Sequence, residues 1–250
     1  MRYSSRFWLY APMAAFLALA AAVMIHWWFA ASAFEKALTA MKGHEAAPGI
    51  TIDWSNVTVG GFPFRIDADF EKFSAAGAGA RGPFTWTSEK FALHSLTYGR
   101  RKTVYEAAGK QNLQWVAGDG LAHNIDFLPG TMRGSSTTDA RGLARFDLDI
   151  VDLDGAGFAI RRAQFHMRRD PDGKDLDVAV RGDDVRGFGE NRPLVEGFFT
   201  LTDAAPLMPL LAGQAFWPDA VRAWHEKDGQ QRLTKGTLPD MAARALSGLY

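Results

Sequence analysis

The residue types that could carry out catalysis are scattered along this chain. It contains no cysteine, which excludes a thiolate nucleophile, a thiolate metal site and disulfide bonds. No two histidines have the i, i+4 spacing of a metal-binding pair on a helix, and the motifs G-x-S-x-G and H-E-x-x-H do not occur. The histidines are His26, His44, His94, His123, His166 and His225. We therefore expect no catalytic residues, no metal, no cofactor and no enzymatic activity.

The densest acidic segment contains Asp147, Asp149, Asp152 and Asp154. Clustered carboxylates suit calcium, but this segment lacks the D-x-D-x-D-G spacing of a calcium loop. Alternate carboxylates on a strand are typical of its solvated face. We expect a solvated face here, with calcium binding as the alternative.

Three short basic segments, 100–102, 161–162 and 168–169, could contact anionic lipid head groups. Acidic residues flank most of them, so a mixed, solvated surface is the simpler interpretation. Lys plus Arg and Asp plus Glu both number 28, so no overall positive field attracts nucleic acid. We expect no nucleic-acid partner.

Residues 7–34 contain no charged side chain and predict a transmembrane helix. About 28 residues in a helix extend roughly 42 Å, which exceeds the hydrocarbon core of about 30 Å. Trp8 and Tyr10 stand near one end, and Trp27 and Trp28 near the other, where aromatic rings favour the membrane–water interfaces. The segment is therefore expected to remain in the membrane as an anchor.

The charges around this segment predict its orientation. Arg2 and Arg6 precede it, so residues 1–6 should be cytoplasmic and the rest of the chain periplasmic, with one pass through the inner membrane. The alternative is a signal peptide cleaved after Ala33, at the A-x-A-like site Ala31-Ser32-Ala33. The apolar run is longer than the usual core of a signal peptide, which favours the anchor. Both interpretations export the remaining chain.

Beyond the anchor the sequence predicts three segments. Residues 35–47 have apolar positions at helical spacing and form an amphipathic stalk. Residues 48–229 alternate apolar and polar side chains and form a β-rich extracytoplasmic domain. Residues 230–250 have no clear period, so we expect an irregular tail there.

The clearest predicted strand runs from Phe62 to Phe70. Phe62, Phe64 and Ile66 share its apolar face, and Arg65 lies on the polar face, where it either pairs with Asp67 or contacts a ligand. Pro63 cannot donate a ladder hydrogen bond, so the strand should begin there or lie at an edge. The candidate ligand contacts are Phe62, Phe64, Arg65 and Ile66.

Further one-faced strands follow, joined by short turns. The turn Asp170-Pro171-Asp172-Gly173 predicts a hairpin, and Pro218 suits the first turn of a short helix. Successive one-faced strands without alternating helices favour an antiparallel meander. The fold class is therefore mainly β, a large curved antiparallel sheet or a two-layer β domain preceded by one transmembrane helix. The apolar face must be covered by the domain itself or by a ligand.

The segment Gly60-Gly61-Phe62-Pro63-Phe64-Arg65 resembles the motif of a bacterial envelope family known as domain of unknown function 2125, in which a GFPFR-like motif follows a single N-terminal helix. The resemblance implies a membrane-anchored envelope protein without known catalytic residues. The layout is also similar to that of anchored proteins whose curved sheets form lipid-binding grooves. We expect binding of lipid or another apolar ligand; the alternative is a non-catalytic structural module that docks an envelope protein.

Overall fold

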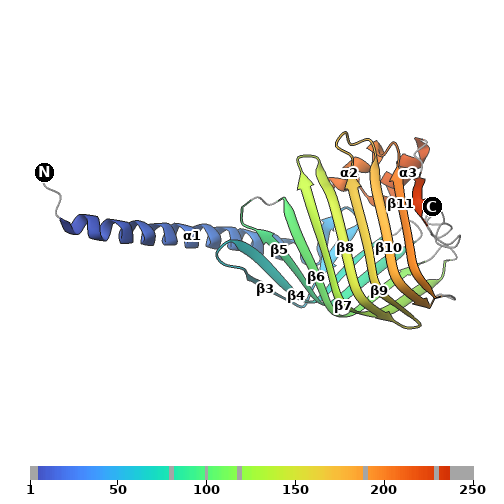
Figure 1. The fold of residues 1–250 in the computed structure, drawn as a ribbon, viewed down its shortest axis with the longest axis horizontal. Helices are drawn as coiled ribbons and strands as arrows, with labels where there is room; N and C mark the ends of the chain where they lie inside the picture. The colour runs from blue at the N-terminus through green and yellow to red at the C-terminus, as the bar shows by residue number, and fades with distance from the viewer. Residues whose placement is uncertain are drawn as a thin grey trace.

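The structure is a computed structural model that describes residues 5–78, 82–98, 101–116, 120–187, 191–227 and 231–236, with backbone only at residues 5–9 and 231–236. One long helix, α1, projects from a large curved antiparallel sheet, as Figure 1 shows. The mainly β fold with a curved antiparallel sheet is therefore confirmed.

Helix α1 (Ser5–Met41) is built almost entirely from Ala, Leu, Met and aromatic residues up to Phe34. Its segment Tyr10–Met41 is long and apolar enough to cross a membrane, judged by length and composition. The helix ends because Gly43, at φ +71°, adopts the left-handed conformation that terminates helices.

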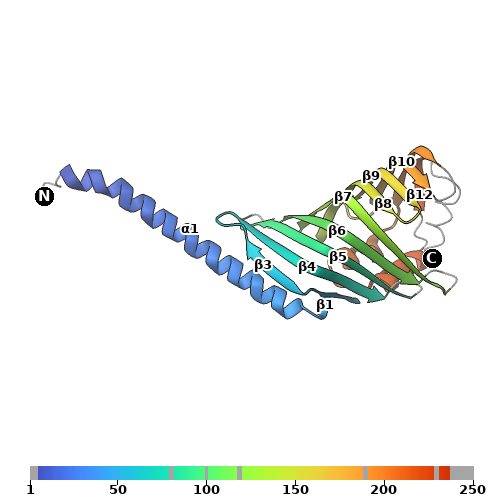
Figure 2. The same cartoon turned by 90° about the horizontal axis from the view of Figure 1, so that it is seen from below.

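The two halves of α1 have different surroundings. Most large apolar side chains between Tyr10 and Phe29 are exposed, whereas Ala30, Ala31 and Leu38 are buried. The second half therefore packs on the sheet, and Figure 2 shows it passing along the β3 side. The stalk is helical up to Met41, but the prediction was wrong for its end, because residues 44–47 form strand β1.

In the part of the chain that the structure describes, twelve strands form one sheet in which every pair of neighbours is antiparallel. Its order is β1-β2-β4-β5-β6-β7-β8-β9-β10-β11-β12, and β3 pairs with β4 beside β2. The strands are β1 (His44–Ala47), β2 (Ile50–Asp53), β3 (Asn56–Gly60), β4 (Arg65–Ala78), β5 (Pro83–Leu96), β6 (Lys102–Val116), β7 (Ala122–Asp139), β8 (Gly142–Gly155), β9 (Phe158–Arg169), β10 (Leu176–Gly187), β11 (Arg192–Leu201) and β12 (Gln231–Gly236).

The predicted strand Phe62–Phe70 begins later than expected. Residues 62–64 form a turn, and β4 starts at Arg65. The reason lies in the motif, since Gly61 takes φ +94° and Pro63, after a cis peptide bond, cannot donate to a ladder. Ile66, with Ala68 and Phe70, is buried as the alternation predicts.

The C-terminal part contains short helices and a strand. A 3-10 turn (Ala205–Leu207) and α2 (Met208–Leu211) precede α3 (Trp217–Glu226), which confirms the helix predicted around Pro218. The hairpin at Asp170–Gly173 is also confirmed, because β9 pairs with β10. The irregular tail was wrong for residues 231–236, since they pair with β11 as β12; residues 237–250 lie outside the described part.

The C-terminal helices contact the first strands. The indole of Trp217 donates a 2.9 Å hydrogen bond to the carbonyl of Ala78 at the end of β4, and the ring of Phe216 lies against Gly49. The hydrogen bond joins residues that are 139 positions apart in the sequence. The sheet therefore curls enough for one segment to link its two ends.

Two buried clusters occupy the ends of the apolar face. One contains Leu38 of α1 with Trp54, Phe70 and Phe73. The other surrounds Trp224 of α3, which is almost fully buried and donates to the carbonyl of Thr202. Between these clusters, over β5 to β8, most of the large apolar side chains are only partly buried, for example Phe91, Met132 and Phe146.

Candidate functional site: an apolar groove and the Arg65 cluster

The partly buried middle of the sheet forms a groove. Alternation along β5 to β8 and their register bring apolar side chains together, for example Phe91 opposite Ala107 and Ala107 opposite Met132. The groove has a volume of about 430 Å³ and exposes only apolar surface. It is lined by Trp86, Phe91, Tyr105, Ala107, Leu113, Phe127, Met132, Gly134, Phe146 and Leu148.

Stacked rings make one wall of the groove continuous with the buried core. Phe91 stacks on Phe73 with ring centroids 4.5 Å apart, and the ring of Tyr105 follows at 6.3 Å from Phe91. Trp86 meets Phe91 edge-on at 5.7 Å. Such aromatic pairs hold each other in place, so this wall is preformed rather than assembled around a ligand.

The four residues predicted to contact a ligand occupy three different environments. Ile66 is buried in the sheet, Arg65 lies on the polar face, and Phe62 and Phe64 are exposed on the turn before β4. None of them lines the groove. The groove residues were missed because the pattern identifies each strand separately, whereas the groove depends on the register of four strands.

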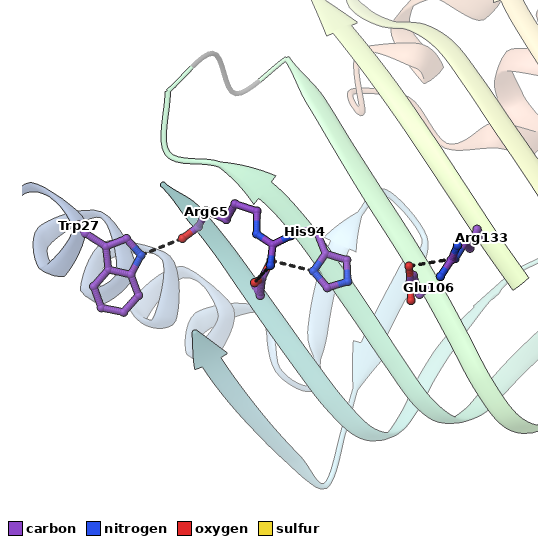
Figure 3. Close-up of polar contacts among 6 residues, drawn as sticks. Trp27, Arg65, His94, Glu106 and Arg133 are labelled. Carbon is purple, nitrogen blue, oxygen red and sulfur yellow. Dashed lines mark hydrogen bonds and ion pairs between the residues drawn. The ribbon is translucent and has the colours of Figure 1, made fainter. Parts of the chain in front are cut away.

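Arg65 is the first residue of a short ion-pair cluster on the polar face, shown in Figure 3. Its guanidinium donates to Asp67 at 3.0 Å, and Nδ1 of His94 lies 2.7 Å from the other carboxylate oxygen. Asp67 is buried, so these two partners satisfy a carboxylate that water does not reach freely. The predicted pairing of Arg65 with Asp67 is confirmed.

The same motif fastens α1 to the sheet. The indole of Trp27 donates a 2.8 Å hydrogen bond to the carbonyl of Arg65, and its ring meets Phe62 edge-on at 5.5 Å. A Cβ atom at Gly61 would lie 2.8 Å from the Arg65 carbonyl oxygen and from the Asp67 carboxylate. Only glycine fits at this position without close contacts. The contacts of Trp27 with Phe62 and Arg65 therefore attach α1 to the sheet through a tightly packed GFPFR turn.

The acidic segment pairs with cations on β8 and β9. Asp147 accepts from Arg145 at 2.7 Å and lies 2.7 Å from Nδ1 of His166. Asp149 accepts from Arg162 at 2.7 Å, and this hydrogen bond lowers the pKa of Asp149. Within the described ranges, no three His, Asp or Glu residues are grouped so that they could hold a metal ion. This face is the mixed, ion-paired surface that the sequence favours.

A glycine-rich segment at residues 77–82 fits the G-x-G-x-x-G spacing of dinucleotide-binding loops. That motif binds phosphate where a strand leads into a helix. Here the segment connects the antiparallel strands β4 and β5. Its position therefore gives no support to nucleotide binding.

The predicted interface aromatics lie along α1. Tyr10 and Trp28 are exposed, and Trp27 is partly buried by its contacts with the motif. The side chain of Trp8 lies outside the described part of the structure.

Comparison with known proteins identifies a family and no individual relative. No curated protein and no solved structure matches the chain. The bacterial family DUF2125, described as uncharacterized proteins conserved in bacteria, matches residues 27–248. That range begins at Trp27, which contacts the motif, and includes the entire described sheet. The chain therefore belongs to the DUF2125 family, as its GFPFR segment predicts.

Proposed function

We propose that this protein is a membrane-anchored envelope protein that holds a lipid acyl chain, or another apolar ligand, in the groove over β5 to β8. The observation that carries the proposal is the groove itself, which exposes only apolar atoms on a folded domain. Its volume of about 430 Å³ falls within the range of roughly 300–1,000 Å³ typical of small-molecule sites.

Exposed apolar surface is the physical reason to expect a ligand. Each Å² of apolar surface left in water forgoes about 25 cal/mol of stabilisation. In the part of the chain that the structure describes, helices cover the two ends of the apolar face but not its middle. A bound acyl chain would cover that middle and needs no polar partner, which matches the chemistry of the lining.

The anchor in this proposal is the exposed half of α1. Tyr10 and Trp28 are 18 positions apart, which corresponds to about 27 Å of helix, close to the hydrocarbon thickness of about 30 Å. Arg2 and Arg6, which precede the anchor, support a topology with the N-terminus in the cytoplasm and the sheet in the periplasm. Cleavage after Ala33 would remove the buried Ala30 and Ala31, so an uncleaved helix fits the packing better.

Organic extraction of the purified chain, followed by mass spectrometry, tests the groove. A transmembrane helix also retains lipid, so the informative comparison is between two variants that share the same anchor. Met132→Glu places a charge in the groove, whereas Thr131→Glu places it on the opposite, exposed face of the same strand. We expect Met132→Glu to lose most of the lipid and Thr131→Glu to retain the wild-type amount.

Equal lipid in the two variants would contradict groove binding and favour the alternative, a structural module that docks an envelope protein. The proposal contains no catalytic step. Generic esterase and phosphatase substrates check this part, and turnover that depends on a residue of the protein would contradict it.

A further inference from the structure

The turn before β4 exposes two large aromatic side chains. Phe62 and Phe64 are 54% and 56% exposed on a three-residue turn. The backbone of this turn is fixed, since the amide and hydroxyl of Thr97 both donate to the Phe64 carbonyl at 3.0 Å. Phe62 meets the ring of Trp27 edge-on, and the rest of these two rigidly held phenylalanine rings forms an exposed apolar surface.

The end of β5 extends this apolar surface. Leu96 pairs with Arg65 across the β4–β5 ladder and is 38% exposed. Tyr98, two residues further, is 62% exposed. Its phenol gives this patch an amphipathic ring of the kind that favours membrane–water interfaces.

The turn lies where α1 leaves the sheet. Trp27 contacts both Phe62 and the Arg65 carbonyl, and the next two helix residues, Trp28 and Phe29, are 60% and 63% exposed. From Ala30 onward one face of the helix packs against the body, with Ala30, Ala31 and Leu38 buried. The exposed aromatic side chains of the turn and of the helix therefore lie at the same height along the axis of α1. This height is about 27 Å from Tyr10 along the helix.

Basic side chains stand beside the patch. Arg65 and Lys102 line a shallow hollow together with His94 and Glu106, on the polar face at the same end of these strands. The side chain of Arg65 is 61% exposed although its guanidinium pairs with Asp67. Aromatic rings with adjacent cations match the interfacial zone of a bilayer, where rings enter the boundary of the acyl chains and cations meet phosphates.

We propose that the Phe62-Pro63-Phe64 turn, with Leu96 and Tyr98, is a second membrane contact that enters the interfacial zone of the leaflet from which α1 emerges. The partner is the lipid surface itself. Together with the helix, this contact fixes the orientation of the sheet on the membrane, so the domain does not rotate freely on a stalk. The inference rests on the anchor in the proposed function.

The absence of cysteine allows a direct test in the full chain. Single cysteines at Phe64, Leu19 and Leu128 are labelled with an environment-sensitive fluorophore, and the chain is reconstituted in phosphatidylethanolamine/phosphatidylglycerol vesicles with and without lipids that carry a quencher near the head group. All three positions are exposed, but Leu19 lies in α1 and Leu128 on β7 away from the turn. We expect a blue-shifted, quenched label at Phe64 and an unquenched label at Leu128.

The three positions separate the possible failures. A label at Phe64 that behaves like the one at Leu128, while Leu19 shows a membrane environment, would overturn the second contact and leave the anchor intact. Labels that all remain in water would overturn the anchor and the second contact together. The lipid content of the groove variants is measured independently and is unaffected by either result.

Discussion

The α1 end and the middle of the apolar sheet face differ in how their side chains are covered. At the α1 end, Trp54, Phe70 and Phe73 are only 4–7% exposed, because Leu38 and its neighbours on the helix lie over them. In the middle, Phe127 and Phe146 point to the same face and remain partly exposed. Alternation of apolar residues therefore specifies which face of a sheet avoids water but does not specify what covers it.

The largest expected effect tests this difference directly. Phe70→Ala at the α1 end should lower the free energy of unfolding by about 3–5 kcal/mol, as expected when a buried aromatic side chain leaves a cavity. Phe146→Ala in the groove should cost about half as much or less, since part of its ring already meets solvent. Urea unfolding in a mild detergent, followed by Trp fluorescence, measures both. Equal losses would mean that the middle of the face is as well covered as its end.

Glycine substitutions sharpen the comparison through the backbone. Gly61→Ala should lower the stability by about 1–3 kcal/mol, because φ is +94° and the new Cβ would lie 2.8 Å from two oxygen atoms. Gly134→Ala in the groove should be nearly neutral, since its Cβ would meet its nearest neighbour at 3.5 Å. A Cβ atom added at Gly60 would have no atom within 4 Å. Gly60→Ala is therefore the control for a glycine substitution in the same segment without a close contact. Thermal unfolding followed by circular dichroism compares the three, and a loss in Gly60→Ala equal to that in Gly61→Ala would refute the close-contact explanation.

The sequence predicted the faces of the strands better than their boundaries. Period-2 alternation continues through Phe62 and Phe64, so the pattern alone extends the strand into what the structure shows is a turn. The contributions of Gly61 and Pro63 outweigh that pattern locally, because one adopts a left-handed conformation and the other cannot donate a hydrogen bond.

The groove was beyond sequence reasoning for a different reason. The ladders contain register shifts between Ser88 and Lys90 and between Ala107 and Gln111, which decide which side chains meet across β5, β6 and β7. The contact of Trp217 with Ala78 is equally hidden, since it joins residues 139 positions apart. The local periodicity of apolar residues predicts neither the register shifts nor this long-range contact.

That long-range contact gives a smaller prediction. Trp217→Phe removes the hydrogen bond to the Ala78 carbonyl while it keeps most of the ring, so the stability should fall by about 1 kcal/mol. Trp28→Phe, on the exposed part of α1, is the matched control and should leave the unfolding of the sheet unchanged. The comparison is made by urea unfolding. An unchanged midpoint for Trp217→Phe would show that the C-terminal segment does not help to hold the two ends of the sheet together.

The smallest expected change in stability concerns the polar face of the sheet, opposite the groove, where side chains form ion pairs instead of a buried apolar core. The hydrogen bond from Arg162 lowers the pKa of Asp149 below its ordinary value. Protonation of this carboxyl is therefore harder in the folded state, so the pair contributes stability above the unfolded pKa of about 4. That contribution is lost as the pH falls through the lower, folded pKa. Asp149 and Arg162 are 37% and 45% exposed, so solvent screens this pair and its contribution to stability should be the smallest of those compared.

Asp149→Asn isolates this contribution. At pH 7 the variant should be slightly less stable than the wild type, and the difference should shrink as the pH falls through the folded pKa of Asp149. Asp154→Asn is the matched control, because Asp154 is exposed on the same strand and has no ion pair within the described residues. Urea midpoints between pH 7 and pH 3 follow both variants. A difference between wild type and Asp149→Asn that does not shrink between pH 7 and pH 3 would assign the effect to packing rather than to charge, and would mean that the polar face is held together in the same way as the α1 end.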